Sequence, residues 1–178
     1  MKKVILSAVF LALLTIWSTS LYAQNRPVLK PGMIFIIKPE LHILFDAQFL
    51  GRYEFADPFS FEYGGGFGIN TTTFAYDFVL GGVLTFRRGK FVPTIRAAFV
   101  LKGLNQFSQS PPPGRSGGEY NNDMILAGSF GPEFNWIMKN KRWLGFGVSL
   151  ELGETVTDFE GKGKVFYLGI LPYLNFVF

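Results

Sequence analysis

The single histidine, His42, is the first residue to test for chemistry, because a histidine can activate a serine hydroxyl as a nucleophile. Two positions further on, where a strand would place the next side chain on the same face, the sequence has Leu44 and not a serine. Ser60, Ser129 and Ser149 belong to other segments, whereas a nucleophile and its base must lie within hydrogen-bond reach. We therefore interpret His42 as a polar rim residue and expect that the protein is not an enzyme.

The sequence shows no pattern typical of a metal site, a phosphate loop or a nucleic-acid site. One histidine, no cysteine and acids spread over many segments give no metal-ligand spacing. The run Gly64-Gly65-Gly66 lies inside a strand-like pattern with no helix after it, so we interpret it as relief of crowding and not as a phosphate loop. Lys and Arg number 17 against 13 Asp and Glu, and they do not cluster. We expect no cofactor, no metal and no nucleic-acid partner.

Charged residues spaced around predicted turns form a more informative set. Arg52 and Glu62 each lie five positions from Asp57, so a turn at Asp57 would make them cross-strand partners. Arg96 and Glu133 fall at a similar depth on two neighbouring segments. These residues either line a polar pore or gate, or form an interior plug of ion pairs. The choice depends on the elements that hold them.

The N-terminal residues predict an export signal. Two lysines precede an apolar run, Val4–Trp17, and small or polar residues follow it, which is the three-part pattern of a secretory signal peptide. We predict a removed signal peptide over 1–23 and a single domain over 24–178, with cleavage after Ser20 as an alternative. A retained anchor is the competing interpretation, but the apolar run is shorter than the roughly 20 residues that a spanning helix needs.

The rest of the chain alternates with period 2, which is typical of β-strands with two unlike faces. Each of seven such segments is long enough to cross a bilayer as a tilted strand, which takes about 9–11 residues. The seven segments are 41–55, 59–70, 74–86, 91–103, 124–138, 143–153 and 166–178. An eighth strand over 28–38 alternates poorly, and we assign it partly because bacterial barrels have even numbers of strands.

Short and long connections alternate in the second half of the chain, whereas 38–40 and 70–73 would be unusually short outer loops. Short polar turns are expected at 56–58, 87–90 and 139–141, whereas 106–121 and 154–163 form longer links. An up-and-down barrel has this rhythm when one rim is tight and the other faces outward. We predict an all-β fold: an antiparallel up-and-down transmembrane β-barrel of eight strands. An extracellular ligand would bind at the two longer links.

The apolar faces of these strands are predicted to meet lipid. A soluble lipocalin-like barrel would alternate too, but its narrow interior would not hold so many large rings. The opposite faces also lack the dense Lys and Glu of a water-facing surface. Rings gather at the short-turn end, as in the girdle at a membrane interface. The predicted girdle comprises Tyr53, Phe55, Phe59, Phe86, Phe91 and Trp136, accompanied by Phe61, Phe134, Phe176 and Phe178. Trp143 is an exception, because it lies at this level with the opposite parity.

The C-terminal segment 168–178 is the most specific motif, because apolar residues alternate up to a terminal aromatic residue. With the signal peptide and the period-2 strands, it resembles the small eight-stranded outer-membrane β-barrel proteins of Gram-negative bacteria over 24–178. Pro172 departs from the pattern, since it removes one ladder hydrogen bond. The resemblance implies an outer-membrane location, contact with outer-membrane lipid and recognition by the barrel-assembly machinery during insertion. The residues it implies as the assembly signal are Leu174, Phe176 and Phe178.

An eight-stranded barrel favours the interior plug over the pore. Its interior is only just wide enough to be filled by side chains, so we favour a plug of ion pairs that includes Arg52, Glu62, Arg96 and Glu133. We expect a non-enzymatic membrane-structural or surface-interaction protein. The alternatives are a narrow passive channel or carrier for small or apolar solutes and, third, a lipid-modifying enzyme that would use His42.

Overall fold

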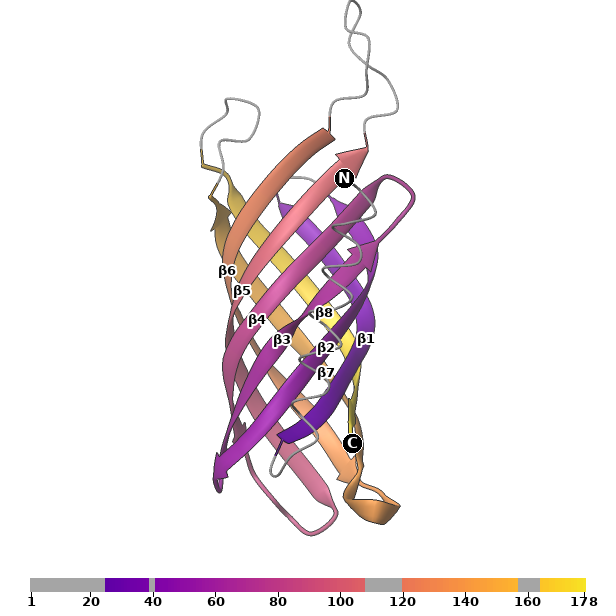
Figure 1. The fold of residues 1–178 in the computed structure, drawn as a ribbon, viewed down its shortest axis with the longest axis vertical. Coiled ribbons are helices and arrows are strands. Elements are labelled where there is room, and N and C mark those ends of the chain that lie inside the picture. The colour runs from indigo at the N-terminus through magenta and orange to yellow at the C-terminus, as the bar shows by residue number, and fades with distance from the viewer. Residues whose placement is uncertain (1–24, 39–40, 108–119, 157–163) are drawn as a thin grey trace, which may run out of the picture.

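The computed structural model describes residues 25–38, 41–107, 120–156 and 164–178, so the predicted signal peptide lies outside the described residues. They form a closed barrel of eight antiparallel strands that pair in chain order, with the last strand closing against the first (Figure 1). The strands are β1 (Asn25–Lys38), β2 (His42–Ala56), β3 (Phe59–Ile69), β4 (Thr73–Thr85), β5 (Phe91–Phe107), β6 (Tyr120–Ile137), β7 (Trp143–Thr155) and β8 (Phe166–Val177). The predicted fold class, with eight strands, is therefore confirmed.

The two ends of the barrel differ in their connections, although the β3–β4 link (70–72), at the end opposite the C-terminus, is also short. The short connections β2–β3, β4–β5 and β6–β7 lie at the bottom of Figure 1, together with the C-terminus. We call this end the short-turn end and the opposite one the long-loop end. The chain closes on itself at the short-turn end, where the amide of Phe178 donates to the carbonyl of Pro27 at 3.0 Å. A short 3₁₀ helix, η1 (Lys139–Lys141), forms the β6–β7 turn. Within the described residues, no helix is long and apolar enough to cross a membrane.

The first strand alternates poorly in the sequence because both of its faces carry apolar residues. Ile34 and Ile36 are fully buried in the barrel, whereas Met33, Phe35 and Ile37 have the opposite parity and are partly or largely exposed. Hydrogen bonding to β2 and β8 holds this strand in the barrel wall whatever its side chains are.

The predicted link 106–121 is shorter than we expected. Strands β5 and β6 extend to a pairing of Phe107 with Tyr120, so both continue into the polar segment that indicated a loop. The hydrogen bonds of the ladder join only backbone groups, so polar side chains do not prevent the two strands from continuing beyond the membrane. Of the other predicted link, 154–163, β7 already includes the first two residues, and residues 157–163 lie outside the described part.

Buried and exposed residues alternate along the strands as the period-2 pattern predicted. In β7 the outward residues Leu144, Phe146 and Val148 are exposed, while Gly145 and Ser149 face the interior. The outer surface therefore presents a continuous belt of large apolar side chains. A folded chain that exposes such a belt fits a lipid environment, because soluble monomers rarely expose apolar patches beyond a few hundred Å². The closed ladder also leaves no strand edge unpaired.

Tyrosine rings lie over glycines on directly paired strands, and one such pair shapes the interior. Gly147 in β7 pairs with Tyr173 in β8, and a Cβ at Gly147 would lie 2.7 Å from Cζ of the tyrosine ring. The absence of a side chain at Gly147 thus provides space for the buried ring of Tyr173. This placement brings the tyrosine hydroxyl toward the charged residues inside the barrel.

Candidate functional site

Five charged side chains from five strands meet in the half of the interior nearer the short turns. All are 0–1% exposed. We call them the short-turn cluster: Lys30 (β1), Arg52 (β2), Glu62 (β3), Arg96 (β5) and Glu133 (β6). They belong to strands on different sides of the barrel, so their contacts cross the interior and do not merely follow one wall.

Arg52 and Glu62 are direct cross-strand partners on β2 and β3. The Arg52 guanidinium donates to Oε1 of Glu62 through Nε at 2.9 Å and through Nη2 at 2.5 Å. Nη2 also lies 2.9 Å from Oε2 of Glu133. The structure thus brings together the two residues that the spacing around Asp57 had matched, and Arg52 links them to a third strand.

Lys30 is the residue that the sequence analysis missed. Its Nζ lies 3.0 Å from Oε2 of Glu62 and 2.5 Å from Oε1 of Glu133, so it bridges the two carboxylates. The ammonium also lies 5.2 Å from the centre of the Tyr173 ring. A lone lysine within an apolar strand was the available signal, but β1 alternates too weakly to show that Lys30 points inward.

Arg96 pairs with Glu62 and not with Glu133, the carboxylate expected at a similar depth on the neighbouring strand. Its Nε donates to Oε2 of Glu62 at 2.9 Å, and Nη1 lies 3.3 Å from Oγ of Ser129. In the β5–β6 register, Glu133 pairs with Thr94 and not with Arg96. The long guanidinium side chain crosses the interior to β3, whereas no direct Arg96–Glu133 contact appears among the ion pairs of the described residues.

Glu133 is the most heavily coordinated side chain of the short-turn cluster. Besides Lys30 and Arg52, it accepts hydrogen bonds from Thr94 Oγ1 at 2.9 Å, Tyr173 Oη at 3.0 Å and Asn175 Nδ2 at 3.2 Å. A buried carboxylate is costly unless it is paired and hydrogen-bonded, and donors from four strands meet that need here. The cluster holds three cations and two carboxylates, so a positive charge is in excess.

A second group of polar residues lies toward the long-loop end. We call it the loop-side cluster: Asp46 and Gln48 (β2), Asp77 (β4), Lys102 (β5), Glu151 (β7) and Tyr167 (β8). Lys102 Nζ lies 2.9 Å from Glu151 and 4.0 Å from Asp77, and the Tyr167 hydroxyl donates to Glu151 at 2.8 Å. Gln48 Nε2 donates to Asp77 at 3.1 Å. Of the three carboxyl groups in this cluster, those of Glu151 and Asp77 lie within 4.0 Å of the one lysine.

The residues considered for catalysis lie apart. His42 begins β2 at the long-loop end and is partly exposed. Ser60, Ser129 and Ser149 are buried on β3, β6 and β7, and Ser60 lies near the start of its strand, at the opposite, short-turn end. Among the described residues, no group of three or more His, Cys, Asp or Glu is arranged to hold a metal ion.

The residues predicted for the aromatic girdle lie mainly on the outer surface. Four of them are exposed: Tyr53, Phe59, Phe86 and Trp136. Phe91 is partly buried because its ring packs against Trp136, with ring centres 5.3 Å apart, while the side chain of Phe55 lies outside the described part. Trp143 points inward, as its parity indicated, and its ring lies 5.2 Å from the guanidinium of Arg26.

The residues of the expected assembly signal end the last strand at the short-turn end. Leu174 and Phe178 are exposed on the outer surface, and Phe176 is partly exposed. The guanidinium of Arg142 lies 5.7 Å from the Phe178 ring.

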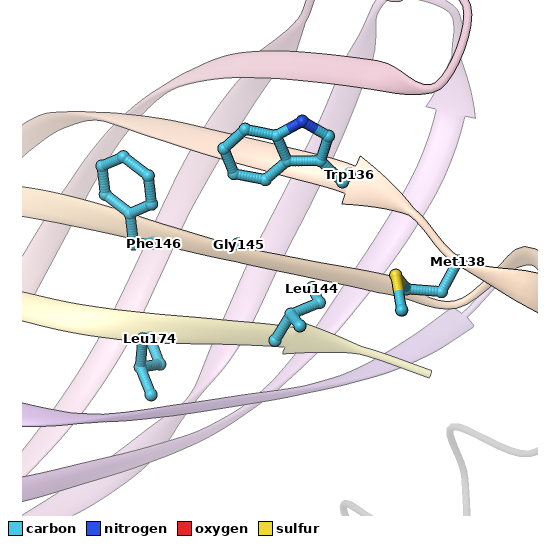
Figure 2. A pocket seen from close by; sticks show the side chains of 6 residues that line it. All are labelled: Trp136, Met138, Leu144, Gly145, Phe146 and Leu174. Atoms are coloured by element: carbon cyan, nitrogen blue, oxygen red, sulfur yellow. The ribbon is translucent and has the colours of Figure 1, made fainter.

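An apolar groove runs over the outer surface at the short-turn end, across β6, β7 and β8. Figure 2 shows its lining: Trp136, Met138, Leu144, Gly145, Phe146 and Leu174. Gly145 contributes only backbone atoms to the groove, because a Cβ at this position would point to the interior, toward Asn135. No charged residue lines this groove.

Comparisons with known proteins give a fold and no close relative. No protein family and no curated protein sequence matches the chain. The crystal structure of Neisserial surface protein A (NspA) matches with a TM-score of 0.64 and 9% identity, covering 87% of this chain and 96% of that one. The N-terminal β-barrel domain of Pseudomonas aeruginosa OprF matches with a TM-score of 0.54 and 10% identity, covering 87% and 98%.

The chain has the fold of the small eight-stranded outer-membrane β-barrels. The resemblance predicted from the sequence is thus confirmed at the level of the fold. The exposed apolar belt gives an independent physical reason to place this barrel in a membrane, and the two together support the predicted outer-membrane location.

Proposed function

We propose that the chain is a non-enzymatic, non-conducting outer-membrane barrel whose interior is filled by its own side chains. Its role is membrane-structural, or it interacts with a ligand through the predicted links 106–121 and 154–163 at the long-loop end. The short turns then face the periplasm, as is usual for such barrels. Insertion is assigned to the barrel-assembly machinery, which would read Leu174, Phe176 and Phe178.

The observation that carries this proposal is the coordination of Glu133. Its carboxylate takes donors from β1, β2, β5 and β8, which lie on several sides of the interior. Ions that pass would have to displace contacts between buried charges, and breaking such a pair costs several kcal/mol. The narrow interior of an eight-stranded barrel offers little room around these side chains.

The runner-up is a narrow channel, and one observation favours it. The loop-side cluster holds three carboxyl groups and one lysine, and the carboxyl oxygens would offer ligands to cations in the outer half of the interior. The positive excess of the short-turn cluster opposes further movement of the same ions. We therefore expect cations to be attracted without being conducted.

Solute uptake into proteoliposomes tests the proposal. Liposomes that contain the full chain should take up potassium and small sugars no faster than protein-free liposomes. Insertion is verified on the same sample by a gel, on which boiled and unboiled barrel should migrate differently. Uptake that rises with the amount of inserted protein would overturn the filled-lumen proposal.

The proposed lack of enzymatic activity has its own test. If His42 served a lipid-modifying reaction, His42→Ala would change the composition of the outer-membrane lipids when the protein is produced in cells. The proposal expects identical lipid profiles for the wild type and the variant at matched protein levels. A lipid species that is present with the wild type and lost with His42→Ala would show that the protein is an enzyme.

A further inference from the structure

The apolar groove at the short-turn end ends against a basic turn. Met138, which precedes η1, and Leu144, which follows it, both line the groove (Figure 2). Between them lie Lys139, Lys141 and Arg142, all of which are exposed. A hydrogen bond of 2.6 Å from the Met138 amide to the Arg142 carbonyl closes the turn. The basic residues are therefore held at one end of the groove.

This arrangement has the two parts that an anionic lipid requires. The groove offers only apolar contacts, which suit an acyl chain, and it lies on the outer surface among lipid-facing strands. The turn offers three positive charges where the barrel leaves the apolar belt. Trp136, which lines the groove, also belongs to the girdle expected at the level of the headgroups.

We propose that this surface binds one anionic phospholipid of the leaflet that meets the short turns, with an acyl chain in the groove and the phosphate at the β6–β7 turn. The site rests on the membrane placement given under the proposed function, but not on whether the lumen conducts. A zwitterionic lipid would gain the same apolar contacts, so the charge of the turn is what selects the anionic class.

The neighbouring basic turn provides a matched comparison. Arg87 and Arg88 lie in the β4–β5 turn on the same rim and are exposed. Arg87 is directed toward Glu54, at 3.4 Å, and toward the inward Trp143 ring, at 5.9 Å. Neither arginine flanks the groove. Replacing them removes as many charges from the rim as replacing the two lysines of η1.

The test measures bound lipid on the full-length barrel by native mass spectrometry. The purified protein in detergent is mixed with phosphatidylglycerol or phosphatidylethanolamine that carry identical acyl chains. The wild type should retain one phosphatidylglycerol in preference to phosphatidylethanolamine. Lys139→Gln with Lys141→Gln should weaken that binding by roughly 30-fold, since each basic residue near an anionic surface contributes roughly fivefold. Arg142 is left intact because it contacts Phe178.

Two further variants complete the design. Arg87→Gln with Arg88→Gln should keep the wild-type preference, whereas Leu144→Trp, which fills the groove and leaves the charges, should lose the lipid. Equal binding of the two lipids, or equal loss in both double variants, would overturn the proposed site. Heat-dependent migration on a gel is checked for every protein. A folded barrel without lipid preference refutes this inference alone, whereas a wild type that forms no barrel refutes the proposed function itself.

Discussion

Arg52 and Glu62 face each other from neighbouring strands, and two guanidinium nitrogens lie 2.9 and 2.5 Å from one carboxylate oxygen. Both side chains are fully buried. Removing one member of an isolated buried pair leaves an uncompensated charge and typically costs about 3–5 kcal/mol. This pair is not isolated, because Glu62 also holds Lys30 and Arg96. The pair is therefore best tested by comparing single and double replacements.

Arg52→Met combined with Glu62→Leu should lower the urea midpoint in detergent more than Arg52→Met alone. Glu62 also holds Lys30 and Arg96, so the double change leaves two buried cations with one carboxylate, whereas the single change leaves two cations and two carboxylates. Glu133 loses Arg52 in both variants, which keeps this loss common to the comparison. A double variant that is as stable as the single one would contradict the assigned contacts of Glu62.

Lys30→Met should destabilise the barrel by about 3–5 kcal/mol. Lys30, like Arg52, lies at ion-pair distance from both carboxylates of the short-turn cluster, so both lose a buried partner. The matched control is Lys164→Met, which breaks an exposed pair with Glu154 of similar length, 2.8 Å. Exposed pairs contribute about 0–1 kcal/mol. Equal shifts of the unfolding midpoint in the two variants would show that Lys30 stabilises the barrel no more than the exposed Lys164 does.

Gly147→Ala should destabilise the barrel by about 1–3 kcal/mol, since the new Cβ would displace the Tyr173 ring and its hydrogen bond to Glu133. Gly82→Ala is the control, because no atom lies within 4 Å of a Cβ built at Gly82 on the outer surface. Unfolding midpoints of the two variants should differ clearly. A stable Gly147→Ala barrel would mean that the ring position is not tightly held.

Replacing Phe176 and Phe178 together by Asp should block insertion. The folding penalty of acids near the interface is modest, about 0–1 kcal/mol each, so a large loss must come from failed recognition during assembly. Phe166→Asp places an acid at the other end of the same strand, where Phe166 is also exposed. The control should reach the outer membrane, and the double variant should not. Normal membrane levels of the double variant would rule out this role for the ending.

The sequence was sufficient to predict the strands whose two faces meet different surroundings. A lipid-facing side and a crowded interior require unlike residues, so period 2 appears wherever the interior holds small or polar side chains, as in β7. β1 is the exception because Ile34 and Ile36 fill the interior. The pairing of Arg52 with Glu62 was predictable because both residues lie five positions from Asp57 in the turn between their strands. Contacts across the lumen depend on strand tilt and barrel closure, and no local pattern encodes those.

That limit explains what the sequence missed inside the barrel. Arg96 donates a hydrogen bond to Glu62, which lies two strands away. Lys30 contacts Glu62 and Glu133 from β1, whose weak alternation did not show which residues point inward. The groove beside η1 also arises only when β6, β7 and β8 lie side by side.

Single-channel recording in planar bilayers tests the central claim, a filled lumen, most directly. The folded wild-type barrel should insert without producing current steps, because the short-turn cluster occupies the interior. Arg52→Met with Glu62→Leu should also remain silent, since it exchanges charged volume for apolar volume. Reproducible steps from the wild type, combined with an unfolding midpoint that Arg52→Ala leaves unchanged, would show that these charges line a pore.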